Sequence, residues 1–233
     1  MKNKAMLISI LLISFIQFEL HSQERLQKGN YYIGGGIGFS TRDESLDDDD
    51  LNASKYDYMR YSLSPYSGKF IKDGLAIGLN LQISSTDLQR EQGTIDNLQV
   101  TKEDGFSIGA GIFLKKYWPV SEKFGAYLIP SLSYSRSHDE SKNTSNTYIS
   151  SSESTSNQIN LSTGLGLYYF ISPRFSLETN LANVVLSKQF LDKETRNTST
   201  EDTLSQSLER NNLDFNLINQ FSFDQIIVIN YYF

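Results

Sequence analysis

The sequence predicts an all-β fold, an eight-stranded antiparallel transmembrane up-and-down β-barrel that follows an N-terminal signal peptide. Three observations predict it: apolar and small polar residues alternate with a period of two, short and long connections alternate, and the chain ends within a strand-like stretch at Phe233. Open sheet edges are hazardous and closure removes them. A strand that extends to the last residue of the chain therefore indicates a closed sheet.

Residues 1–22 are expected to be the signal peptide and residues 23–233 the barrel domain. Lys2 and Lys4 give a basic start, and residues 5–18 are almost wholly apolar. The alternative is a retained anchor, which the run is too short to favour because a helical span needs ~20 residues. The chain has no cysteine, hence no disulfide framework. An exported chain without disulfides fits a bacterial envelope.

The net charge argues against nucleic acid as a partner. It is −6 for the whole chain, and loss of Lys2, Lys4 and Glu19 with the signal peptide makes it −7. The mean hydropathy of −0.37 is that of a soluble protein. A transmembrane barrel nevertheless gives such an average, because its strands alternate apolar and polar residues.

Period two recurs after the signal peptide, and no segment has a convincing helical period. In residues 75–84, for example, Leu79 and Leu81 fall on one face and Gly78 and Asn80 on the other. The expected strands are residues 31–40, 56–67, 75–84, 106–115, 124–135, 159–169, 174–186 and a last strand that starts near residue 213 or near 224 and ends at Phe233.

One face of these strands is apolar and aromatic, and the other is rich in Gly, Ser and Asn. A Gly-rich face is unusual toward water, since Gly weakens strands. A narrow eight-stranded barrel, in contrast, leaves little room for interior side chains. The small polar face is therefore predicted to line the lumen and the apolar face to meet lipid. A soluble β-sandwich and a periplasmic ligand-binding barrel stay as alternatives.

The connections alternate in length, as in outer-membrane barrels with short periplasmic turns and long extracellular loops. Residues 68–73, 118–123 and 171–174 are short connections, which predicts periplasmic termini. Four long extracellular loops are expected at residues 43–55, 87–104, 138–156 and 188–212. Aromatic residues near both ends predict two membrane-interface belts. One belt comprises Tyr31, Phe70, Tyr117, Trp118, Phe124, Tyr169, Phe175, Tyr231 and Phe233, and the other Phe39, Tyr56, Phe106 and Tyr134.

Three segments carry a resemblance to a known group: GKFIKDGLAIGLNLQIS (residues 68–84), GLGLYYFISPRFSLE (residues 164–178) and the terminal INYYF. With these the chain resembles the small OmpX-like and OmpA-barrel-like outer-membrane proteins, especially the "outer membrane protein beta-barrel" families of Bacteroidetes. The resemblance implies a Gram-negative outer membrane and a C-terminal strand that the barrel-assembly machinery reads. The matching positions of that assembly signal are Ile227, Ile229, Tyr231 and Phe233.

The catalytic inventory is sparse, and no catalytic site and no cofactor are expected. His138 is the only histidine after the signal peptide, and it lies beside Asp139 and Glu140 with Ser135 and Ser137 nearby. A hydrolase would need a serine, a histidine and an acid oriented together on a rigid strand end. Residues adjacent in the chain rarely adopt that geometry, so a solvated loop histidine is the simpler interpretation.

Charged residues suggest two further sites. Asp47, Asp48, Asp49 and Asp50 form a cluster that could bind Ca²⁺ or Mg²⁺ weakly, although it lacks the spacing of an EF-hand, and a solvated acidic loop is the simpler interpretation. Inside the barrel, charges rarely stay unpaired. The inward-facing charges are Arg60, Lys115 and Glu178, of which Lys115 and Glu178 could pair across the lumen. Inward tyrosines are expected to plug the periplasmic mouth: Tyr32, Tyr66, Tyr127, Tyr168 and Tyr232.

The sequence thus predicts an outer-membrane barrel with a structural or surface-interaction role, a closed lumen and no catalysis. A small-solute channel and a lipid-modifying enzyme are the alternatives. The expected partners are outer-membrane lipid and lipopolysaccharide, the barrel-assembly machinery during biogenesis and an unknown extracellular partner. The chain is expected to be a monomer.

Overall fold

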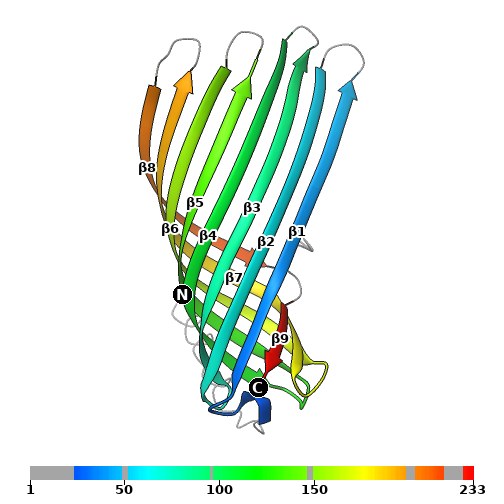
Figure 1. The fold of residues 1–233 in the computed structure, drawn as a ribbon. Helices are drawn as coiled ribbons and strands as arrows, with labels where there is room; N and C mark the ends of the chain where they lie inside the picture. Colours follow the sequence, from blue (N-terminus) through cyan, green and yellow to red (C-terminus); the bar gives the residue numbers. More distant parts are fainter. Residues whose placement is uncertain (1–23, 49–51, 95–96, 146–148, 198–202, 218–227) are drawn as a thin grey trace, which may run out of the picture.

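The structure, a computed structural model, describes residues 24–48, 52–94, 97–145, 149–197, 203–217 and 228–233 (Figure 1). Apart from the short 3-10 helix η1 (Glu24–Leu26), its elements are all strands. Among the described residues, no helix is long and apolar enough to cross a membrane. The strands are β1 (Tyr31–Asp48), β2 (Asn52–Lys72), β3 (Leu75–Thr94), β4 (Asn97–Pro119), β5 (Phe124–Thr144), β6 (Ile149–Phe170), β7 (Phe175–Asn197), β8 (Thr203–Leu217) and β9 (Val228–Tyr232).

The sheet closes into a ring, which confirms the predicted all-β up-and-down barrel. Each strand from β1 to β8 pairs antiparallel with the next along the chain. The short strand β9 completes the ring of eight, because it pairs with β1 on one side and with β7 on the other. The backbones of Tyr31 and Phe233 exchange two hydrogen bonds of 2.9 and 3.0 Å. The chain end thus lies in the sheet, as its sequence predicted.

The eighth position of the ring is filled in two pieces. Strand β8 pairs with residues 182–196 of β7, and β9 pairs with residues 175–178 of the same edge. Only residues 179–181 of β7 separate the two pairings, whereas residues 218–227, which lie outside the described part of the chain, connect β8 to β9. Both starts considered for the last strand, near residue 213 and near residue 224, are therefore too late, because β8 begins at Thr203.

The prediction of four long loops is wrong. The strands β1 to β7 are 18 to 23 residues long, about twice the ~9–11 residues that a barrel strand needs to cross a bilayer. The segments expected as loops are continuations of the hairpins, paired for instance at Ser45↔Lys55 and Glu140↔Glu153. The sequence signal failed there because both faces of these continuations are mostly polar, so the backbone ladder persists without regular apolar alternation. We call the paired parts beyond the apolar band the hairpin extensions.

Side-chain contacts form both along and between the strands of the hairpin extensions. The hydrogen bond to Asp57 raises the pKa of Lys55, and the two charged groups are 2.9 Å apart. Exposed ion pairs of this kind contribute only ~0–1 kcal/mol each, so the backbone ladder holds the extensions together. Further contacts are Lys188–Glu209 at 2.6 Å, Ser207–Asp192 at 2.7 Å and Thr101–Asn143 at 2.5 Å.

The two faces of the strands are sorted as predicted. Outward Leu79 is 62% exposed, whereas inward Tyr32 is completely buried. Nearness to a short turn, however, did not fix the face of an aromatic residue. Phe70 and Tyr117, expected in a lipid-facing belt, point inward and are buried. Phe70 lies an even number of residues from inward Tyr66, and Tyr117 an even number from inward Lys115, so each falls on the inner face of its strand. Figure 1 shows the hairpin ends at one end of the barrel and the short turns at the other, beside β9.

Hydrogen exchange tests whether the extensions are strands. In the bilayer-inserted protein, we expect the amides of residues 138–144 and 149–156 to exchange much more slowly than in a peptide of the same sequence, because the β5–β6 ladder occupies them. Mass spectrometry of deuterated protein, localised by fragmentation, measures this. Exchange at the rate of the free peptide would show that these segments are loops after all.

Candidate functional site

The lumen near the short turns is filled by inward aromatic side chains, which we call the aromatic plug. Strands β1, β2, β4, β5, β6 and β9 supply its rings, because the period of two brings one side chain in two to the interior. Neighbouring ring centroids lie 5.1 to 6.5 Å apart, the spacing of packed aromatic pairs. The plug consists of Tyr32, Tyr66, Phe70, Phe113, Tyr117, Tyr127, Tyr168, Phe170 and Tyr232.

Lys115 and Glu178 form an ion pair inside the aromatic plug, each side chain 2% exposed. Lys115 comes from β4 and Glu178 from β7, so the pair spans the lumen. The Tyr117 hydroxyl donates a 3.0 Å hydrogen bond to Glu178 Oε1, and the Tyr66 hydroxyl oxygen lies 3.3 Å from Oε2. A buried carboxylate needs such donors, because its desolvation is otherwise too costly. The structure thus brings together the two charges that the sequence placed across the lumen.

The lysine is also held by aromatic faces. Its Nζ lies 4.2 Å from the ring centroid of Tyr127 and 5.1 Å from that of Tyr117. The rings of Tyr66 and Tyr32 follow at 5.4 and 5.9 Å. An ammonium over an aromatic face is attracted by the ring quadrupole, more strongly where water is excluded. Four tyrosines and one glutamate therefore replace the water that Lys115 has lost.

A second layer of hydrogen bonds ties the tyrosines to β7 and β9. The Tyr66 hydroxyl donates to Asn230 Oδ1, and Asn230 Nδ2 donates to Ser176 Oγ over 3.2 Å. Ser176 Oγ also lies 3.2 Å from the Tyr232 hydroxyl. Asn230 and Ser176 are completely buried, so these contacts satisfy groups that water cannot reach. Neither residue was predicted from the sequence, although their inward alternation beside Glu178 and Tyr232 could have revealed them.

Glycines on the inner face make room for the large rings. A Cβ atom on Gly68 would lie 2.5 Å from the Tyr32 ring, and one on Gly166 would lie 2.5 Å from the Tyr127 hydroxyl. Both distances are too short for real contacts, so these two positions require glycine. The Gly-rich inner face is therefore complementary to the aromatic plug.

Arg60, the third charge expected in the lumen, is not part of this cluster. It shares the inner face of β2 with Tyr66 but lies six residues further along the strand, or about 20 Å at the usual rise per residue. It pairs in register with Ser40 and Thr86 and is exposed. Its register partners, unlike the plug residues, are small and polar.

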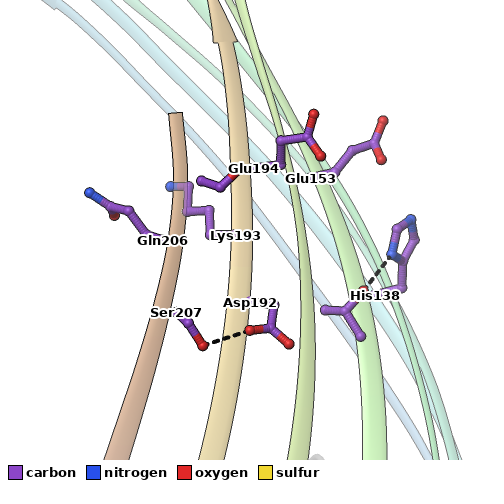
Figure 2. A pocket seen from close by; sticks show the side chains of 9 residues that line it. His138, Glu153, Asp192, Lys193, Glu194, Gln206 and Ser207 are labelled. Carbon is purple, nitrogen blue, oxygen red and sulfur yellow. Dashed lines mark hydrogen bonds between the residues drawn. The ribbon is translucent and has the colours of Figure 1, made fainter. Parts of the chain in front are cut away.

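His138 lies on a hairpin extension rather than in a loop (Figure 2). It lines a hollow of about 410 Å³ on β5–β8. His138 Nδ1 lies 3.4 Å from Thr155 Oγ1, and Nε2 lies 3.3 Å from Glu140 Oε1. Ser207 donates instead to Asp192, 2.7 Å away. Because β6 and β7 lie between His138 and Ser207, about 14 Å at the usual strand spacing, the histidine cannot activate this serine.

The remaining predicted sites are only partly described. The side chains of Asp47, Asp48, Asp49 and Asp50 lie outside the described residues, so the cation-binding prediction stays untested. Among the residues that are described, no group of three or more His, Asp or Glu side chains could hold a metal ion. In the expected assembly signal, Ile227 also lies outside. Ile229 and Phe233 point outward and are 53% and 61% exposed, with Tyr231 between them on the same face.

No protein-family model matches the sequence, and no curated protein sequence matches it. Among solved structures, the chain is similar to the outer membrane protein OprG from Pseudomonas aeruginosa, with a TM-score of 0.51 and 14% identity over 89% of this chain and 97% of that one. It is also similar to a major outer membrane protein from Thermus thermophilus, with a TM-score of 0.46 and 13% identity over 88% and 99%.

The likeness to OprG shows the fold alone, given its low identity. This chain therefore has the fold of an outer-membrane β-barrel protein. The narrower resemblance to OmpX-like and OmpA-barrel-like families stays a prediction.

The ion pair can be tested through stability. Glu178→Ala leaves the lysine buried without its partner, and we expect a loss of about 3–5 kcal/mol in the free energy of unfolding. Adding Lys115→Met to that variant should recover most of the loss, because the uncompensated charge is then gone. Urea unfolding in lipid vesicles, followed by tyrosine and tryptophan fluorescence, measures both.

The exposed Lys188–Glu209 pair provides the control. Glu209→Ala should cost no more than about 1 kcal/mol, since water screens that pair. Equal losses in Glu178→Ala and Glu209→Ala would contradict the assigned role of burial.

Proposed function

We propose that this chain is a non-enzymatic outer-membrane protein that presents tall, rigid hairpins outside the cell on a barrel closed at its periplasmic end. The observation that carries the proposal is the aromatic plug with its buried Lys115–Glu178 pair. Residues from seven of the ring's strands meet there, and the pair is 2% exposed. A conducting channel would need water at this level, where the plug side chains are buried and packed against one another.

The hairpin extensions support the surface role. Strand β2 has 21 residues, which at ~3.3 Å per residue and a tilt of ~40° gives a barrel about 50 Å tall. The apolar band of such a barrel is ~25 Å tall. About half of each hairpin therefore stands outside the bilayer, as a paired sheet with polar side chains on both faces.

Paired extensions suit recognition better than free loops do. A paired backbone is already ordered, so a partner that binds it loses little conformational entropy. The extensions present mainly hydroxyl, amide and charged groups, which fit a hydrated partner such as a glycan or a polar protein surface. In this orientation, lipopolysaccharide surrounds the barrel at the level where the hairpin extensions leave the bilayer.

The connections support an orientation with periplasmic termini. In outer-membrane barrels the short turns are periplasmic, so the proposal assigns the turns after β2, β4 and β6 and strand β9 to that side. Ile229, Tyr231 and Phe233 then form the outward strand face that the barrel-assembly machinery would read, as the resemblance to OmpX-like proteins implies. The barrel is complete with one chain, so we propose a monomer.

Conductance in planar bilayers tests the closed lumen. We expect no steady openings from the wild-type protein. We expect discrete openings from the triple variant Tyr32→Ala, Tyr66→Ala and Tyr117→Ala, because these rings pack against one another across the lumen.

The control for this experiment is Tyr169→Ala, which removes an outward ring and should stay silent. Each variant is used only if it runs as a compact band on unboiled gels. Steady openings of the wild type would overturn the closed-barrel proposal and favour a small-solute channel.

A further inference from the structure

The lipid-facing surface carries a hollow where β9, β1, β2 and β3 lie side by side. Its volume is about 630 Å³, within the ~300–1,000 Å³ of small-molecule sites. The wall is almost wholly apolar and includes Ile33, Ser67, Leu79, Leu81, Ile229 and Tyr231. The hollow therefore lies on the seam where the first and last strands close the barrel.

The sequence builds this hollow by placing small residues at outward positions. Gly35 pairs with Pro65 and Ile33 pairs with Ser67, so the side chains at the centre are short or missing. A Cβ on Gly35 would lie 3.2 Å from Pro65 Cα, too tight for an easy fit. Around this centre Leu79 and Ile33 stand out from the surface, 62% and 51% exposed. The missing volume is thus bounded by apolar walls.

Two cations flank the hollow at the end near the short turns. Tyr231, which lines the hollow, accepts a 3.2 Å hydrogen bond from Arg174 Nη1 at its hydroxyl. Lys69 follows Ser67 by two residues on the same outward face, and its Nζ lies 4.8 Å from the Tyr31 ring centroid. Neither cation is in a salt bridge within the described part of the chain. Both are exposed beside aromatic rings, at the level where lipid headgroups lie.

We propose that the hollow binds one anionic phospholipid, with an acyl chain against Ile33, Ser67 and Leu79 and the phosphate between Lys69 and Arg174. The apolar wall accepts a hydrocarbon chain, and the two cations complement the headgroup charge. A second copy of the barrel fits less well. A two-fold contact through this patch would bring Lys69 and Arg174 of both copies together, and like charges oppose such a contact.

The bound lipid would also cover the β1–β9 seam. Within the described part of the chain, four residue pairs from Tyr32↔Tyr232 to Gly35↔Ile229 join these two strands, next to the backbone hydrogen bonds of Tyr31 with Phe233. A ligand that binds only the closed barrel stabilises it by mass action. The lipid is therefore a structural component of the closure, a role independent of what the hairpin extensions bind.

Native mass spectrometry of the full barrel, folded in nanodiscs of phosphatidylglycerol and phosphatidylcholine and released into detergent, tests the proposal. We expect the wild type to retain one phosphatidylglycerol. Retention should fall roughly tenfold in the double variant Lys69→Gln and Arg174→Gln, since each cation near an anionic lipid contributes to binding. Ser67→Leu, which fills the hollow without altering charge, should lose the lipid as well.

Matched controls separate this site from general effects. Thr163→Leu enlarges an exposed outward residue on β6, and Lys116→Gln with Lys123→Gln removes two cations near another short turn; both should retain the lipid. Equal retention of phosphatidylcholine, unchanged retention in the site variants, or a lipid-free dimer would each overturn the proposal. All variants must show the compact band on unboiled gels, so loss of the barrel itself is recognised separately.

Discussion

A charged group in a lumen without water needs a partner of opposite charge, and the lower half of the barrel is organised around that need. Lys115 meets Glu178 across the interior, and the tyrosines supply hydroxyl donors to the carboxylate and aromatic faces to the ammonium. Those rings are large, so glycine must stand opposite them, as at Gly68 and Gly166. One electrostatic requirement therefore accounts for the aromatic content of the lumen, for the glycines of the inner face and for the close packing of side chains at this end.

The part of the barrel near the short turns and the hairpin extensions lie in different solvents. In the lower half lipid outside and close packing inside impose a strict alternation of apolar and small residues. In the hairpin extensions water meets both faces, so the only shared requirement is that backbone groups pair. Serine, threonine and asparagine satisfy it as well as valine or isoleucine would, and pairs such as Ser207–Asp192 add side-chain contacts. The same strand thus passes from a lipid-facing to a water-facing environment without interrupting its ladder.

This difference explains what the sequence could predict. Alternation located the strands inside the membrane, assigned Lys115 and Glu178 to one interior, and made Phe233 the end of a closing strand. It failed for residues 138–156, because a polar ladder has no hydrophobic period and resembles a loop. It also misjudged Phe70, whose nearness to a turn suggested a belt although its alternation with Tyr66 points inward. Asn230 and Ser176 were not predicted, because their hydrogen-bond partners are distant in the chain. A buried hydrogen-bond network of this kind is recognised only in the folded structure.

The β1–β9 seam has a consequence for the order of events during folding. Tyr32 and Tyr232 are paired although they lie 200 residues apart in the sequence, whereas every other junction of the ring joins neighbours in sequence or near neighbours. Closing so long a loop costs entropy that no local contact repays in advance. Hairpins such as β3–β4 can form early and independently, and the seam can form only when the others are complete. Pairing of the last residues of the chain with β1 is therefore the final step of assembly. The same pairing is the one that would open first when the ring unfolds.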